Sequence, residues 1–356
     1  MRLGLNLGSS RRRHLVQPGA GPSSPQIPLD IPLVQEAERL GYYVVWSAEA
    51  YGSDAIVPLA WVGALTSTIH LGTAIMQIPG RTPANAAMAA ITLDELSGGR
   101  FIMGLGVSGP QVVEGWHGVP FGKPVTRTRE YITVLRQILH REGPVKYTGE
   151  YYHIPYDGSD ATGLGKPLRS ILYPRKDLPI YVAAMGPRNV SMSAELADGI
   201  LPTIFSPDRF DEVFAAPLQD GFSKAGHEKN FETFDVAPVV QVVLGDDLNA
   251  CWDRVRPGLA FSVGVYGARQ RNFYNDVLKR YGYEDVANRV QELYLAGHQN
   301  EAIATIPDAL VDEIALCGPR SRIKERLTRY ARLPIQTLNI RTPTVEVLRM
   351  MAELVL

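Results

Sequence analysis

One short segment joins a strand-like run to a helix-like run through residues that suit an anion. The apolar run Tyr181 to Ala184 is followed almost at once by the Ala-rich run Asn189 to Ala197. The free amides at a helix start, the helix dipole and a nearby arginine together favour a phosphate. We therefore predict an anion site at this junction, made of Ala184, Met185, Gly186, Pro187, Arg188 and Asn189. The alternative is an ordinary turn in which Arg188 is a surface charge.

Two side chains that could handle protons follow another apolar run, Tyr43 to Ser47. Glu49 comes after apolar and small residues, so its carboxylate could lie in a partly dry pocket and act as an acid or base. It could equally pair with a nearby arginine. Tyr51 could donate a proton or stack on a ring, or it could be a packed aromatic residue whose hydroxyl meets water.

A glycine-rich stretch from Gly104 to Gly109 ends a further apolar run. Because glycines let a ligand approach the backbone, Gly106, Val107 and Ser108 are candidate ligand contacts. The spacing GxGxxG does not indicate a dinucleotide site, since no strand tipped by an acidic residue follows at the required distance. His117 could touch a substrate, or its bonds could be satisfied by neighbours.

Two further segments could each contact a ligand or have a purely structural role. The histidines give no sign of a metal site. The run LGTAIMQI, which contains Ala74 and Ile75, could offer a flat wall to an aromatic ring or could simply pack inside a barrel. The loop Thr162 to Leu168 could close over a ligand as a lid or be a plain surface loop. The seven histidines have no metal-ligand spacing, so we expect no metal site.

The elements that must position these residues are short apolar runs separated by helical patterns. Each predicted strand but the last precedes a helix, directly or after an excursion, and eight parallel strands predict an α/β fold of the (β/α)8 TIM-like barrel type with insertions. Functional residues of such a barrel lie at the carboxyl ends of the strands, which adds Asn6 to the candidates. We predict one domain over residues 1–356 with a helical insertion around 249–312. The predicted strands are 2–7, 43–47, 69–78, 101–105, 181–184, 200–203, 236–244 and 337–340.

Composition excludes several classes of partner. The chain has 356 residues, of which 45% are hydrophobic and 21% charged, and its formal net charge is -1. No bulk charge recruits nucleic acid or an acidic membrane surface. The N-terminus lacks the apolar run of a signal peptide, and no apolar segment approaches the ~18 residues that could span a membrane. With only two cysteines, the sequence favours a reducing cytoplasmic location.

Several stretches together resemble a known family. LGYYVVWSAEAYG, IHLGTAI, ITLDELSGGRFIMGLGVS and IYVAAMGPRNVSMSAELADG are similar to the luciferase-like flavin- and deazaflavin-dependent oxidoreductases. The segments YGSDA, SGPQVVEGW and TGLGKPL most resemble the coenzyme F420-dependent branch. The resemblance implies a TIM-like barrel with insertions, usually dimeric. It also implies that the cofactor ring lies against the third strand, at a non-proline cis peptide between Ala74 and Ile75, and that the cofactor phosphate lies on the Met185–Asn189 turn.

The chain departs from the family at one functional position. Many relatives carry an acidic residue followed by histidine after the second strand, whereas this chain has Glu49 and Ala50. The proton-handling role therefore falls to Glu49, Tyr51 or His117, or the substrate needs no such group. The leading hypothesis is F420-dependent hydride transfer to or from a small organic substrate. The alternatives are an FMN-dependent monooxygenase supplied by a partner reductase, and a non-catalytic F420 or flavin carrier or sensor.

Overall fold

A parallel sheet forms the centre of the molecule. The computed structural model describes residues 1–7, 27, 29–226, 228–265, 272–341 and 344–356. All strand pairings of the main sheet are parallel, and its order is β10-β9-β8-β5-β3-β2-β1-β13-β11-β12, with β4 paired to β5. The strands are β1 Arg2–Asn6, β2 Val44–Ser47, β3 His70–Thr73, β4 Met76–Gln77, β5 Phe101–Gly106, β8 Ile180–Val182, β9 Gly199–Ile200, β10 Asp235–Val236, β11 Val239–Leu244, β12 Ala315–Gly318 and β13 Thr337–Arg341.

The sheet curls back on itself at a proline. β10 pairs with β9, and β11 pairs with β13 at the other end of the strand order. Only Ala237 and Pro238 separate β10 from β11, and a further bridge joins Val236 to Ile335. Proline has no N–H for a ladder, which accounts for the break between two strands that run in one direction. The prediction of an α/β barrel of the TIM-like type is confirmed.

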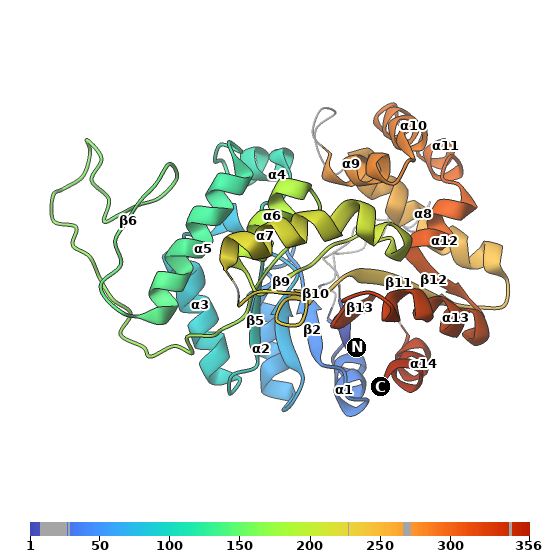
Figure 1. Ribbon diagram of the computed structural model, residues 1–356, viewed down its shortest axis with the longest axis horizontal. Coiled ribbons are helices and arrows are strands. Elements are labelled where there is room, and N and C mark those ends of the chain that lie inside the picture. Colours follow the sequence, from blue (N-terminus) through green and yellow to red (C-terminus); the bar gives the residue numbers. More distant parts are fainter. Residues whose placement is uncertain (8–26, 28, 227, 266–271, 342–343) are drawn as a thin grey trace.

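Helices surround the sheet, as Figure 1 shows. Side chains cap the starts of two helices: Asp30 accepts from the backbone N of Leu33, and Thr82 accepts from that of Asn85. Helices α8 to α12 lie along the chain between β11 and β12. The helices are α1 Ile31–Arg39, α2 Ile56–Leu65, α3 Pro83–Leu96, α4 Pro110–Gly115, α5 Pro124–His140, α6 Pro187–Leu196, α7 Ala216–Ala225, α8 Leu248–Val265, α9 Phe273–Arg280, α10 Glu284–Leu295, α11 Gln299–Ala304, α12 Asp308–Ile314, α13 Arg320–Ala331 and α14 Val345–Val355.

Some boundaries differ from the sequence prediction. The predicted strand 69–78 forms two pieces, β3 and β4, on either side of a cis peptide between Ala74 and Ile75. The cis bond expected from the resemblance is thus present. The prediction that no helix follows the last strand was wrong. Helix α14 follows β13, and the side chain of Thr344 caps its start. Strand β12 was missed, since its four residues are too short for a periodic pattern.

A second apolar cluster fills the inside of the barrel around one tryptophan. The indole Nε1 of Trp46 donates to Asn339 Oδ1 at 2.6 Å, and the ring lies 5.8 Å from that of Tyr181. Glycines on neighbouring strands leave room for it: a Cβ added at Gly72 would lie 2.2 Å from Trp46 Cε3. Side chains therefore fill the barrel interior, so a ligand must bind at an end of it.

The helix lengths and the segment after the small hairpin bear on two further sequence predictions. Within the described ranges, every helix is too short or too polar to span a membrane. A small antiparallel hairpin is formed by β6 Tyr147–Thr148 and β7 His153–Ile154. The segment that follows it projects on the outer side of α5 (Figure 1). There the backbone N of Val145 donates to Leu168 O at 2.8 Å, so the predicted lid does not lie over the carboxyl ends of the strands in this structure.

Candidate functional site

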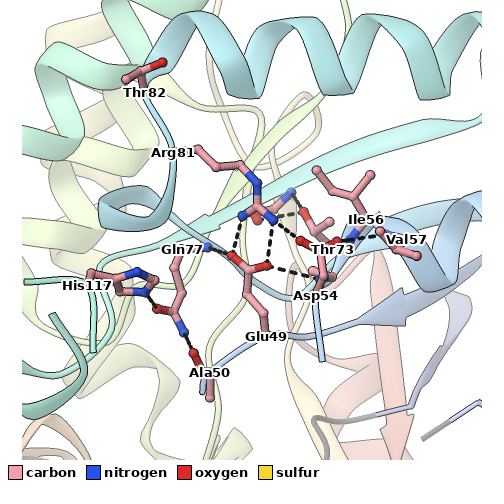
Figure 2. Close-up of polar contacts among 12 residues, drawn as sticks. Glu49, Ala50, Asp54, Ile56, Val57, Thr73, Gln77, Arg81, Thr82 and His117 are labelled. Atoms are coloured by element: carbon pink, nitrogen blue, oxygen red, sulfur yellow. Dashed lines mark hydrogen bonds and ion pairs between the residues drawn. The ribbon is translucent and has the colours of Figure 1, made fainter. Parts of the chain in front are cut away.

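Glu49 lies in a dense set of polar contacts just after β2. Its carboxylate accepts two hydrogen bonds from Arg81, at 2.6 and 3.1 Å. It also accepts from the backbone N of Gln77 at 2.7 Å and of Ala55 at 3.1 Å (Figure 2). Both carboxylate oxygens are thus occupied, and only 10% of the side chain is exposed. This is the ion-pair alternative raised by the sequence, and it limits the capacity of Glu49 to exchange a proton.

Arg81 was not singled out from the sequence, although it organises this cluster. Its guanidinium also binds the carboxylate of Asp54, whose other oxygen accepts from the backbone N atoms of Ile56 and Val57 at the start of α2. Burial opposes the positive charge of Arg81, but the hydrogen bonds and charges of Glu49 and Asp54 outweigh it and raise the pKa of Arg81. The cluster therefore ties β2, α2 and β4 together through charge-assisted bonds.

His117 is linked to the same cluster through a second residue that the sequence reasoning missed. Gln77, which ends β4 and is 1% exposed, accepts from His117 Nε2 at 2.6 Å through its Oε1. Its Nε2 donates to the backbone O of Ala50 at 2.7 Å (Figure 2). A buried amide in the otherwise apolar run LGTAIMQI is the feature that could have drawn attention to Gln77.

Tyr51 is separate from this arrangement. Its side chain is 47% exposed, and it makes no hydrogen bond within the described part of the chain. Of the three predicted proton-handling residues, the structure therefore places Glu49 and His117 in one hydrogen-bonded network and leaves Tyr51 outside it.

The predicted ring wall lies beside this network. The backbone N of Ala74 donates to Ser47 O at 2.7 Å, and that of Glu49 donates to Ile75 O at 3.2 Å, so β2 holds both ends of the Ala74–Ile75 bond. A Cβ added at Gly106 would lie 2.6 Å from Ile75 Cγ1, which explains why glycine ends β5. Ser108 has a positive φ of 61° and turns the chain into α4. Asn6 is buried at the end of β1, while Val107 is half-buried.

The junction between β8 and α6 presents an uncapped helix start. Gly186 is the residue before the helix, Pro187 begins it, and no side chain caps its first turn. Arg188 is exposed and has no ion-pair or hydrogen-bond partner within the described part of the chain. The side chain of Asn189 donates to Ala183 O at 3.2 Å, while its buried Oδ1 has no partner among the described residues. The free amides of the first turn and the exposed Arg188 are donors of the kind that a bound anion needs, whereas Asn189 Oδ1 is an acceptor and does not contribute.

A second arginine reaches this junction from far along the chain. Arg280, at the end of α9, donates from Nη1 to Met185 O at 2.6 Å. Burial lowers the pKa of Arg280, although Asp276 partly opposes this effect. No local sequence pattern indicates this contact, because 95 residues separate the two partners. Among the described residues there is no group of three His, Cys, Asp or Glu side chains placed to hold a metal ion.

The chain matches known proteins over most of its length. Residues 4–337 match the model of the family described as luciferase-like monooxygenase. A Mycobacterium tuberculosis protein, provisionally named a coenzyme F420-dependent oxidoreductase, is 44% identical over 324 residues, which cover 91% of this chain and 93% of the relative. The chain therefore belongs to the luciferase-like family, and it is an oxidoreductase.

Solved structures share the fold at lower identity. The coenzyme F420-dependent tetrahydromethanopterin reductase of Methanopyrus kandleri has a TM-score of 0.76 at 22% identity and covers 99% of this chain and 97% of its own. An F420-dependent secondary alcohol dehydrogenase, solved with an F420–acetone adduct, has a TM-score of 0.75 at 16% identity, with 99% and 98% covered. At these low identities, the similarity shows a shared fold and nothing further.

Proposed function

We propose that this oxidoreductase uses coenzyme F420 and transfers a hydride between the deazaflavin and a small organic substrate. The observation that carries the proposal is the uncapped start of α6, with the guanidinium groups of Arg188 and Arg280 beside it. The name of the 44% identical relative supports the choice of F420 among phosphate-bearing cofactors.

The residues at the α6 start suit a phosphate in charge and in space. Arg280 is already held against the turn by Met185 O, so little side-chain order would be lost when it meets an anion. A Cβ added at Gly186 would have Arg280 Nη2 as its nearest neighbour, at 4.0 Å, so this turn is open. Both the backbone amides and the arginines would then contact the cofactor phosphate.

The rest of the cofactor would lie along the carboxyl ends of β3 to β5. When bound, the deazaflavin supplies hydride chemistry at its ring carbon. In this proposal Ala74 and Ile75 form one face of its site, and Gly106, Val107, Ser108 and Asn6 line the edge. Glu49 acts as a positioning residue, because its bonds to Arg81 and to the backbone of Gln77 hold the segment that forms this face.

The experiment is a pair of binding titrations on the purified apo-protein with F420 and FMN, each in both redox states. Tight binding of F420 and weak binding of FMN supports the proposal. The reverse preference, together with oxygen consumption driven by reduced FMN, would favour the alternative of an FMN-dependent monooxygenase with a partner reductase. That alternative is kept because the family description names monooxygenases. Binding of neither cofactor would contradict both.

We also propose that the active form is a homodimer that pairs through α2 and α3. Helix α2, IVPLAWVGAL, contains no charged residue, yet Val57, Trp61 and Leu65 are exposed, and Trp61 is 62% exposed. Met88 and Leu96 of α3 are exposed as well. A helix of 10 residues that is apolar all round needs a protein partner, and a second copy would offer the same face. A cytoplasmic location fits the two free, buried cysteines.

A further inference from the structure

The side chain of Gln77 connects the backbone of Ala50 to the imidazole of His117. Its amide lies between the backbone O of Ala50 and the imidazole of His117 (Figure 2), with distances of 2.7 and 2.6 Å. The His117 ring packs against the 3-10 turn after β4, where a Cβ added at Gly80 would lie 3.1 Å from its Cε1. The ring is thus held by contacts on two sides.

These contacts determine which imidazole nitrogen carries a hydrogen. The carbonyl of Ala50 can only accept, so the NH2 group of Gln77 must face it. The Oε1 of Gln77 then faces His117 and can also only accept, which requires a hydrogen on Nε2. Neutral His117 therefore has its lone pair on Nδ1, and protonated His117 has its second hydrogen there. Nδ1 has no hydrogen-bond partner within the described part of the chain.

The location of the ring suits a role in the reaction. Gln77 pairs with Gly106 in the register of β4 and β5, so His117 lies at the carboxyl end of the barrel beside the proposed ring wall. His117 is half-buried, so a substrate could reach Nδ1. Ala50 itself offers no titratable group.

We propose that His117 exchanges a proton with the substrate through Nδ1, and that Gln77 is the positioning residue that fixes the required tautomer. The inference rests on the proposed F420-dependent function. Bound reduced F420 would supply the hydride for such a substrate; with an enone, the hydride would bond to the β-carbon and the C=C electrons would move to leave an enolate oxygen. The Nδ1–H bond of His117 breaks, its proton forms an O–H bond on that oxygen, and the electron pair stays on Nδ1.

The carboxylates of Glu114, Glu49 and Asp54 are engaged with groups other than His117. Glu114, on the helix that ends just before His117, accepts from the backbone N of Phe121 at 3.1 Å. Beyond Gln77, the charges of Glu49 and Asp54 are matched by Arg81. Gln77 is therefore the only side chain within the described part of the chain that bonds the imidazole, which makes it a clean target for substitution.

The first test needs neither cofactor nor substrate. The whole protein, labelled with 15N-histidine, is examined by long-range 1H–15N correlation, and the His117 signals are assigned from the His117→Gln variant. We expect the Nε2–H tautomer in the wild type and a mixture of both tautomers in Gln77→Leu. Gln77→Glu keeps the acceptor at Nε2–H and adds charge, so it should retain the tautomer and hold the imidazolium to higher pH. Gln299→Leu, an exposed glutamine on α11, is the control.

The second test measures turnover of reduced F420 with 2-cyclohexen-1-one as the probe acceptor. His117→Gln should lower kcat by about a hundredfold or more and remove one limb of the pH profile, while F420 affinity stays within about twofold. Gln77→Leu should lower kcat by roughly tenfold, and Gln77→Glu should move the limb to higher pH. A merely structural role for Gln77 would leave the position of that limb unchanged.

The outcomes separate this inference from the proposed function. An Nδ1–H tautomer in the wild type, or an unchanged tautomer in Gln77→Leu, overturns the role of Gln77. Full kcat in His117→Gln overturns the role of His117. Failure of the wild type to bind F420, with the expected tautomer present, would contradict the proposed function and leave the assignment of the tautomer supported.

Discussion

The guanidinium of Arg81 binds both carboxylate oxygens of Glu49, with Nη1 to Oε1 at 2.6 Å and Nη2 to Oε2 at 3.1 Å. The two residues are 32 positions apart, and the side chains of Arg81 and Glu49 are 16% and 10% exposed. Such a pair is costly to break because one charge remains buried without its partner. It therefore fixes the end of β2 against the segment that follows β4.

Substitution of Glu49 tests that positioning role. We expect Glu49→Gln to lower the free energy of unfolding by about 2–3 kcal/mol, less than the ~3–5 kcal/mol of a fully buried pair because Asp54 still binds Arg81. The affinity for F420 should also fall, because Glu49 holds the segment that forms one face of the proposed cofactor site. Urea denaturation and cofactor titration measure the two effects. Glu150→Gln, which breaks the exposed pair with Lys123, is the control and should cost less than ~1 kcal/mol. Equal losses in both variants would contradict a special role for Glu49.

The two arginines beside α6 should contribute to phosphate binding. Each of Arg188→Ala and Arg280→Ala removes a charged donor worth about 1.5–3 kcal/mol, so the Kd for F420 should rise roughly tenfold to a hundredfold. Titration of F420 fluorescence measures it. Arg332→Ala, at an exposed residue after α13, should leave the Kd unchanged. Should both variants keep the wild-type Kd, the phosphate lies elsewhere.

The barrel interior should reject a methyl group at Gly72. A Cβ there would lie 2.2 Å from Trp46 Cε3, and Trp46 is held by its bond to Asn339. We expect Gly72→Ala to lower the free energy of unfolding by about 2 kcal/mol or more. Gly258→Ala is the matched control, because no atom lies within 4 Å of its added Cβ and alanine favours a helix. Thermal unfolding measures the stability of both variants, and equal stability of Gly72→Ala and Gly258→Ala would contradict the prediction.

The exposed apolar face of α2 and α3 should mediate dimerisation. Trp61→Glu introduces a charge at its centre and should convert the dimer into a monomer, measured by light scattering after size-exclusion chromatography. Leu295→Glu, at another exposed apolar residue on α10, should leave the mass unchanged. A wild type that is monomeric at micromolar concentration would refute the proposed interface.

The carboxylate of Glu38 should make stability depend on acid. Its Oε1 accepts from the backbone N atoms of Ser67, Thr68 and Ile69 at 2.7, 2.6 and 3.1 Å. Burial opposes ionisation, but these hydrogen bonds outweigh it and lower the pKa of Glu38 below 4.5.

A lowered pKa in the folded state means that the stabilisation is present above pH 4.5 and is lost as the pH falls through the folded pKa. Glu38→Gln should therefore cost about 1 kcal/mol at pH 7, and the difference from the wild type should shrink below pH 4.5. Urea denaturation between pH 3 and 7 measures it. Glu95→Gln, at an exposed residue of α3, should show no such pH-dependent difference.

Local pattern was sufficient to predict most elements and their ends. Short apolar runs alternating with amphipathic ones predicted a parallel barrel. The caps at Asp30 and Thr82 are equally local, because each accepts a hydrogen bond from a residue only three positions away. The carboxyl ends of the strands followed from the same pattern, which is why Glu49 and the Met185–Asn189 turn could be chosen as candidates. Strand β12 escaped because a run of four apolar residues carries no periodicity.

The partners of those residues were decided only by the tertiary structure. Whether Glu49 meets a substrate or Arg81, and whether His117 faces solvent or Gln77, depends on how β2, β4 and β5 are paired and where the chain turns between them. Arg280 reaches Met185 across 95 residues, and no local pattern encodes such a distance. The sequence by itself determined which chemical groups stand at the end of each strand. Their bonds, and hence their chemical capacity, depend on side chains that only the closed barrel brings within 3 Å of each other.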